Sequence, residues 1–265
     1  MANANCPVGV FDSGVGGISV LAELRRQLPH EQFVYFGDTC HAPYGTKAPE
    51  EVLGYVRDVM AHLIAMDSKA VVIACNTATS VAAATLRQEL ALPIIGMEPA
   101  LKPAAQLRHG GQILVLATPV TLRLPKFQAL MARYGEGTTP LPCPGLMELV
   151  EAEDFAAAER YLRERFAAFN LHNVDAVVLG CTHYVFLRPT LAHILPPEVR
   201  VLDGNAGTAR QLQRVLEEKQ LLRTEGDGDV TLLTSGDIAK EEPVMRRLLA
   251  LADSFHVASG NAKAK

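Results

Sequence analysis

We expect no N-terminal targeting segment, and the sequence has no apolar run long enough to cross a membrane. Residues Met1 to Pro7 contain no basic stretch followed by an apolar one, and no uncharged apolar run reaches about 18 residues. Charge of one sign is not in excess, because 25 basic residues are balanced by 29 acidic ones to give a net charge of −4. Attraction to nucleic acid or to anionic membranes is therefore not expected. We expect a cytoplasmic protein with a small-molecule partner.

The cysteines do not form the pattern of a disulfide framework. Their number, five, is odd, none is part of a CxxC pair, and no export signal is present. Cys6, Cys40 and Cys143 are interpreted as small buried apolar residues. A metal site is not expected, because Cys40, His41, Cys75, Cys181 and His183 include no pair with the usual spacing of zinc ligands.

Three common enzyme motifs are also missing around the first glycine-rich segment. Gly14-Val15-Gly16-Gly17 lacks the third glycine of the dinucleotide fingerprint, since Ser19 stands there. No Lys-Ser or Lys-Thr follows to complete a phosphate-binding loop. Ser13 has Phe11 where the nucleophile elbow of a serine hydrolase requires glycine. We interpret the glycines as allowing the backbone to approach a small anionic ligand.

Short apolar runs alternate with amphipathic stretches along most of the chain. The runs are rich in Val and Ile, which is typical of buried parallel strands, and the alternation predicts an α/β fold. The expected strands are Val8 to Phe11, Phe33 to Phe36, Ala70 to Ala74, Ile94 to Gly96, Ile113 to Ala117, Ala176 to Leu179 and Val199 to Leu202. The expected helices are Ile18 to Gln27, Pro49 to Met66, Ser80 to Glu89, Leu122 to Tyr134 and Phe155 to Phe169.

The chain aligns with itself when it is shifted by 106 residues (181 − 75 and 118 − 12). The shift places Cys75 on Cys181 and Asp12 on Thr118, each directly after an expected strand. We infer two similar α/β lobes, residues 1–98 plus 208–265 and residues 99–207. The first lobe includes a C-terminal addition with an expected strand, Val230 to Thr234, and a helix around Glu242 to Ala252.

Both matched cysteines lie where parallel sheets bind ligands, at the carboxyl ends of strands. Each precedes small polar residues at an expected helix start, where free N–H groups favour a carboxylate or a thiolate of lowered pKa. Two thiols on opposite sides of one cleft would suit inversion of a carbon centre, one removing a proton while the other donates one.

The groups beside the two cysteines differ. Asp12 could relay a proton near Cys75, or it could cap the following helix. His183 could form a thiolate–imidazolium pair with Cys181, or it could simply be packed in the core. A cysteine hydrolase that uses Cys181 and His183 remains an alternative, but it leaves Cys75 without a role.

Four segments in sequence order resemble the glutamate racemase family of the aspartate/glutamate racemase superfamily. They are Phe11-Asp12-Ser13-Gly14-Val15-Gly16-Gly17, Asp38-Thr39 with Pro43-Tyr44-Gly45, Ala74-Cys75-Asn76-Thr77-Ala78-Thr79, and Leu179-Gly180-Cys181-Thr182-His183-Tyr184. The resemblance implies two flavodoxin-like lobes with parallel sheets, pseudo-twofold related, and an active site in the cleft between them. It further implies interconversion of L- and D-glutamate without a cofactor, a role in peptidoglycan synthesis, and a possible homodimer.

The resemblance also implies roles for individual residues. Cys75 and Cys181 match the family's two acid/base residues, and Asp12, His183 and Glu151 match its assisting groups. The implied substrate-binding residues are Asp12, Ser13, Pro43, Tyr44, Gly45, Asn76, Thr77, Thr118, Thr121, Thr182 and His183. Glu148 and Glu153 are alternatives to Glu151 as the assisting acidic residue. Val185 stands where the family often has proline. Aspartate racemisation and a non-catalytic regulatory function on the same fold remain alternatives.

Overall fold

The computed structural model describes residues 3 to 261 and divides the chain into two compact units. Unit 1 contains the residues up to Met97 and those from Asn205 onward, and unit 2 runs from Glu98 to Gly204. The boundaries expected from the sequence lie after residues 98 and 207, and they differ from the observed ones, after residues 97 and 204, by one residue and by three. Within the described residues, no helix combines the length and the apolar character needed to span a membrane.

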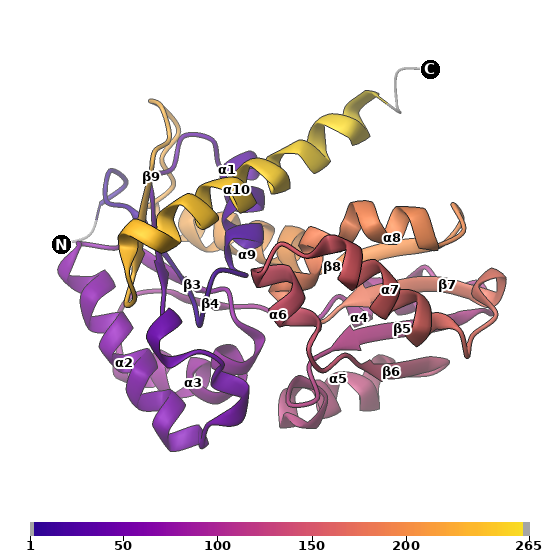
Figure 1. The fold of residues 1–265 in the computed structure, drawn as a ribbon. Coiled ribbons are helices and arrows are strands. Elements are labelled where there is room, and N and C mark those ends of the chain that lie inside the picture. Colours follow the sequence, from indigo (N-terminus) through magenta and orange to yellow (C-terminus); the bar gives the residue numbers. More distant parts are fainter. Residues whose placement is uncertain (1–2, 262–265) are drawn as a thin grey trace. The chain divides into compact units, whose positions relative to one another are not determined.

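Unit 1 is built around a parallel sheet with helices on both faces (Figure 1). The strand order is β4-β3-β1-β2-β9, and neighbouring strands pair in parallel throughout. The strands are β1 (Val8–Asp12), β2 (Phe33–Gly37), β3 (Ala70–Ile73), β4 (Ile94–Gly96) and β9 (Val230–Thr234). The helices are α1 (Ile18–Gln27), α2 (Pro49–Ala65), α3 (Asn76–Glu89), α9 (Asn205–Glu218) and α10 (Ile238–Asn261).

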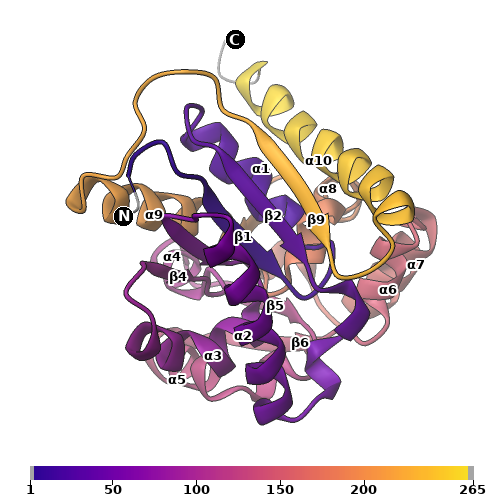
Figure 2. The same ribbon diagram turned by 90° about the vertical axis from the view of Figure 1, so that its left-hand side faces the viewer.

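The sequence of each element explains how it packs in unit 1. β1 and β2 are buried along their whole length, as expected for strands covered on both faces. Helix α2 starts with Pro49, which suits a first turn, and buries one stripe at helical spacing that includes Val52, Val56 and Leu63. Helices α2 and α3 cover one face of the sheet, and α1 packs against α9 and α10 on the other (Figure 2).

Unit 2 repeats this plan with the strand order β6-β5-β7-β8, again parallel. Its strands are β5 (Gln112–Ala117), β6 (Thr138–Pro142), β7 (Val174–Leu179) and β8 (Arg200–Asp203). Its helices are α4 (Leu101–Gln106), α5 (Pro125–Tyr134), α6 (Leu146–Glu151), α7 (Phe155–Phe166) and α8 (Arg188–Ile194). A six-residue 3₁₀ helix, Thr182–Leu187, lies between β7 and α8.

The two sheets have equivalent strand orders. A shift of 106 residues moves β2 to 139–143, which overlaps β6 with an offset of one residue. The same shift moves β3 to 176–179, within β7. Under this shift the order β4-β3-β1-β2 becomes β8-β7-β5-β6, which is the observed order read from the other edge. In the described residues, β9 extends only the sheet of unit 1, where it pairs with β2.

Several predicted elements differ from the structure at their ends. The helix expected from Ser80 begins at Asn76, directly after Cys75, and the helix expected from Leu122 begins at Pro125. The helix expected around Glu242 to Ala252 is a longer one that starts at Ile238. Strand β6 and the short helices α4, α6 and α8 were not predicted.

Candidate functional site

Asp12 is the last residue of β1 and starts a tight turn at the carboxyl end of that strand. Its side chain is buried, and Oδ1 accepts a hydrogen bond of 2.8 Å from the backbone N–H of Gly14. The N-cap residue of α1 is Gly17, so Asp12 does not occupy the N-cap position of this helix. A Cβ on Gly17 would lie 2.6 Å from Cβ of Asp12, so only glycine leaves the carboxylate room.

Cys75 follows β3 and is the N-cap of α3. Its Sγ accepts a hydrogen bond from the Ala78 N–H at 3.4 Å and lies 3.4 Å from Oγ of Ser13. Burial, together with the negative charge of Asp12, raises the pKa of Cys75 to about 12, although the hydrogen bonds act in the opposite direction. The expected lowering of this pKa at the helix start is therefore wrong. Desolvation outweighs the helix terminus, and the thiol is protonated at neutral pH.

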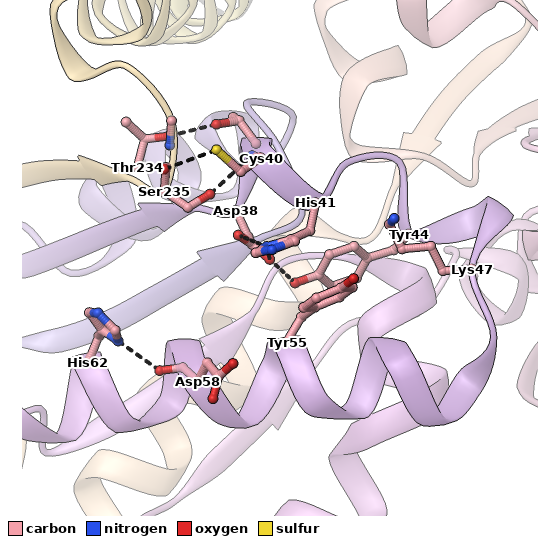
Figure 3. Close-up of polar contacts among 12 residues, drawn as sticks. Asp38, Cys40, His41, Tyr44, Lys47, Tyr55, Asp58, His62, Thr234 and Ser235 are labelled. Atoms are coloured by element: carbon pink, nitrogen blue, oxygen red, sulfur yellow. Dashed lines mark hydrogen bonds and ion pairs between the residues drawn. The ribbon is translucent and has the colours of Figure 1, made fainter.

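The loop after β2 carries Pro43, Tyr44 and Gly45, and a buried carboxylate holds it together (Figure 3). The Tyr44 hydroxyl donates a 2.5 Å hydrogen bond to Oδ2 of Asp38, and Nδ1 of His41 lies 2.8 Å from Oδ1 of the same residue. Burial first, and then Asp38, raises the pKa of Tyr44 far above its ordinary value. Asp38 is not among the site residues predicted from the sequence, although its position directly after a buried strand indicates this rim of the sheet.

Cys181 occupies the equivalent place in unit 2, after β7, and is the N-cap of the 3₁₀ helix Thr182–Leu187. Its Sγ lies 3.7 Å from Nδ1 of His183, and Nε2 of His183 lies 3.0 Å from Oε1 of Glu151 at the end of α6. The three groups thus form a chain of thiol, imidazole and carboxylate. The spacing of the acidic residues left Glu148 and Glu153 open as partners, and the observed contact is made by Glu151.

The imidazole of His183 is almost fully buried, yet its environment favours the protonated form. Burial alone would lower the pKa of His183, but hydrogen bonds and charges from Cys181 and Glu151 outweigh it and raise the pKa well above 6.5. Burial alone would raise the pKa of Glu151, but His183 outweighs it and lowers that pKa. Both directions favour an imidazolium beside a carboxylate, which is the arrangement that stabilises a neighbouring thiolate.

Hydroxyl and amide groups stand beside both thiols. Thr118 follows β5 at the position equivalent to Asp12, and its Oγ1 lies 2.9 Å from Oγ1 of Thr121 and accepts the Thr121 N–H. Asn76 and Thr77 open α3 directly after Cys75, and Thr182 opens the 3₁₀ helix after Cys181. Helix starts and hydroxyl groups of this kind are suited to binding carboxylates.

Of the three remaining cysteines, one agrees with the interpretation as a buried apolar residue and two differ from it. Cys143 is buried, but Cys40 is exposed and Cys6 is partly exposed. The Cys40 thiol donates a 3.1 Å hydrogen bond to the Ser235 carbonyl. The error for Cys40 has a physical reason, because the residue lies in a 3₁₀ turn outside the sheet. In the described residues, no three His, Cys, Asp or Glu side chains are grouped so that they could hold a metal ion.

Comparison with known proteins identifies the family. The family model described as Asp/Glu/Hydantoin racemase matches residues 13 to 212. A glutamate racemase from Bifidobacterium animalis subsp. lactis is 49% identical over 240 residues, which cover 88% of this chain and 93% of that protein.

Solved structures agree with this relationship. The crystal structure of glutamate racemase isoform RacE1 from Bacillus anthracis has a TM-score of 0.82 at 30% identity, covering 94% of this chain and 95% of that one. The Escherichia coli glutamate racemase in complex with L-glutamate and activator UDP-MurNAc-ala has a TM-score of 0.79 at 31% identity, covering 91% and 94%. This chain belongs to the Asp/Glu/Hydantoin racemase family.

Proposed function

We propose that this protein interconverts L-glutamate and D-glutamate, with Cys75 and Cys181 as its two acid/base residues. One observation carries the proposal: each unit presents one cysteine at the carboxyl end of an equivalent strand, beside groups that can take up or supply a proton. The relatives that cover nearly all of this chain are named glutamate racemases, and one was solved with L-glutamate bound.

The proposed reaction is a proton exchange at the α-carbon. One cysteine, as thiolate, removes the α-proton and becomes a thiol, while the negative charge spreads into the substrate's α-carboxylate. The other cysteine, as thiol, donates its proton to the opposite face and becomes a thiolate. The reverse direction exchanges these roles. The mechanism requires both sulfur atoms to reach the same carbon.

The two cysteines would reach their thiolate forms by different routes. Cys181 has the His183 imidazolium at 3.7 Å, and Glu151 keeps that imidazole protonated. Cys75 instead lies near Asp12, whose carboxylate can accept a proton from the thiol. After that transfer the negative charge lies on the Cys75 sulfur, and the substrate's ammonium group would offset it.

The substrate would be held by the polar groups at the strand ends. Ser13, Asn76 and Thr77 in unit 1, and Thr118, Thr121 and Thr182 in unit 2, would bind the two carboxylates. Pro43, Tyr44 and Gly45 would form one wall of the site. We further propose that the protein works in the cytoplasm, supplies D-glutamate for peptidoglycan, and forms a homodimer.

Incubation of the protein with L-glutamate in deuterium oxide, without added cofactor, tests the proposal. Optical rotation should decay to zero, and deuterium should enter the α-position. Turnover of aspartate with inert glutamate would instead indicate an aspartate racemase, and inertness toward both would indicate a non-catalytic protein.

Single cysteine variants test the mechanism. Cys75→Ala and Cys181→Ala should each reduce racemisation by about 10³-fold or more, because each removes one of the two proton-transfer groups. Cys6→Ala is the matched control, since this partly exposed thiol lies in the N-terminal segment, outside the proposed machinery, and it should keep wild-type activity. Near-normal activity of either test variant would remove that cysteine from the mechanism.

A further inference from the structure

The C-terminal addition of unit 1 contacts the loop that carries the proposed substrate wall. Strand β9 lies beside β2, and the Ser235 N–H donates a 3.0 Å hydrogen bond to the carbonyl of Gly37, the last residue of β2. Ser235 Oγ accepts the Cys40 N–H at 3.1 Å, and the Ser235 carbonyl accepts the Cys40 thiol (Figure 3). The addition thus reaches the loop from a segment almost 200 residues away in sequence.

The centre of this contact is the carboxylate of Glu241 on the first turn of α10. The Thr39 hydroxyl lies 2.9 Å from Oε1 and 2.7 Å from Oε2 of Glu241, and the Thr234 hydroxyl donates to Oε2. The two hydroxyls lie 2.8 Å from each other. Hydrogen bonds to a carboxylate are stronger than those between neutral groups, so Glu241 ties the end of β9 to the start of the loop.

The backbone around Glu241 is shaped for this approach. A Cβ added to Gly236 would collide with the Glu241 carboxylate and would lie 2.6 Å from Oγ1 of Thr39. The Gly236 N–H also donates a 3.0 Å hydrogen bond to the Thr234 hydroxyl. Only glycine leaves the carboxylate space between the two threonines.

Thr39 directly follows Asp38, whose carboxylate binds two other side chains of the same loop. Asp38 bonds with Tyr44 and His41, and Tyr44 is buried against Phe11 at a centroid distance of 6.1 Å. Release of Thr39 would allow Asp38 to move, and with it the tyrosine of the proposed substrate wall. The loop is therefore held by Asp38, one of its own residues, and by Glu241 of helix α10.

We propose that Glu241 is a positioning residue for substrate binding, acting through Thr39 on the loop from Asp38 to Lys47. The inference rests on the proposed function, because it assigns the loop a substrate. Glu241 does not touch the reacting atoms. Its removal therefore loosens the loop and weakens glutamate binding more than it slows proton transfer.

The test compares Glu241→Ala with Glu242→Ala, a matched control at the next position of the same helix, whose carboxylate pairs with Arg246. We expect Glu241→Ala to raise KM for glutamate about tenfold or more, with a smaller change in kcat, since small misplacements of positioning groups have large kinetic effects. Glu241→Gln retains an acceptor and should restore most of the loss. Thr39→Val should reproduce it, and the double variant Thr39→Val with Glu241→Ala should be no worse than either single one.

Alkylation of Cys40 gives a readout that does not depend on activity. Its thiol is exposed and bonded to Ser235, so iodoacetamide labelling followed by peptide mass spectrometry reports whether the loop is released. Labelling should be faster in Glu241→Ala and unchanged in Glu242→Ala. An active wild-type protein whose Glu241→Ala variant labels faster but keeps its KM would overturn this inference alone, as would equal effects in both variants. A wild-type protein inert toward glutamate would overturn the proposed function and this inference with it.

Discussion

His183 Nε2 lies 3.0 Å from Oε1 of Glu151, and this contact determines what the other ring nitrogen can do. A carboxylate at one nitrogen fixes the orientation of the ring and favours the imidazolium. The Nδ1–H then points toward the sulfur 3.7 Å away and can stabilise a thiolate there. The proposed effect of His183 on the second cysteine therefore depends on a carboxylate that bonds to the far side of the ring.

Replacement of Glu151 by Gln tests this dependence. The amide can still accept a hydrogen bond, but it carries no charge, so the pKa of His183 should fall. We expect kcat to drop about 10- to 100-fold, and the alkaline limb of the pH profile of kcat/KM to move to lower pH, because the imidazolium loses its proton earlier. Glu148→Gln on the same helix is the control. An unmoved alkaline limb would show that Glu151 does not set the charge of His183.

The same pair predicts how stability depends on pH. The folded pKa of His183 is raised, so its contribution is fully present below about 6.5 and is lost as pH rises through the folded value. The folded pKa of Glu151 is lowered, so its contribution is present above about 4.5 and is lost as pH falls through the folded value. Glu151→Gln should therefore destabilise the protein most at pH 5 to 6 and progressively less at higher pH. Urea unfolding across this range measures the difference, and a pH-independent loss would contradict it.

Asp12→Asn should make the Cys75 thiol more acidic and yet slow racemisation. Removal of the neighbouring negative charge lowers the pKa of Cys75 below about 12, while burial keeps it above the ordinary value. Racemisation should nevertheless fall by about 10² to 10⁴, because the proposed proton acceptor is lost. The pH dependence of Cys75 alkylation gives the pKa, and exposed Asp58→Asn is the control. A more acidic thiol with undiminished turnover would exclude Asp12 from the proton path.

The positions of both cysteines could be predicted from sequence because they depend on strand pattern and duplication. Val72 to Cys75 and Val178 to Cys181 are apolar runs that end in a thiol, and both strands end near the predicted places. Strand β6 was missed because Pro140 and Pro142 interrupt its pattern, although the shift of 106 residues places β2 on it. Its pairing with β5 alone, at the sheet edge, is what tolerates the prolines.

The electrostatics could not be predicted in the same way. The pKa of Cys75 depends on how completely its sulfur is buried, and local sequence shows only the helix start that favours the thiolate. The bond between Thr39 and Glu241 joins residues 202 apart, for which no periodic pattern exists. Three-dimensional contacts of this kind decide the charge and the rigidity of the site.

Gly17→Ala tests how closely the first glycine-rich turn approaches Asp12. The added Cβ would lie 2.6 Å from Cβ of Asp12 and 3.1 Å from Cβ of Ala74, so the carboxylate must move. We expect at least a tenfold loss of kcat/KM. Gly54→Ala in helix α2 is the control, because nothing lies within 4 Å of its added Cβ; it should keep full activity and gain about 0.5–1 kcal/mol of stability. Equal activity of the two variants would contradict the steric argument.

Lys69 and Glu31 form an ion pair with fully buried side chains, 2.6 Å apart, at the amino ends of β3 and β2. Lys69 also donates to the Ala4 carbonyl at 2.6 Å, and Glu31 accepts the Arg223 N–H at 2.9 Å, so the pair joins the N-terminal segment to the C-terminal addition. Burial is the main cause that lowers the pKa of Lys69, against the opposing effect of Glu31.

Lys69→Met should destabilise the fold by about 3–5 kcal/mol, because it leaves Glu31 as an unpaired buried charge. The double variant Lys69→Met with Glu31→Leu removes both charges and should recover part of that loss, although the hydrogen bond to Arg223 is not restored. Urea unfolding at pH 7 measures both free energies. If the double variant is less stable than Lys69→Met, then the hydrogen bonds of Glu31, rather than its charge balance with Lys69, hold the addition in place.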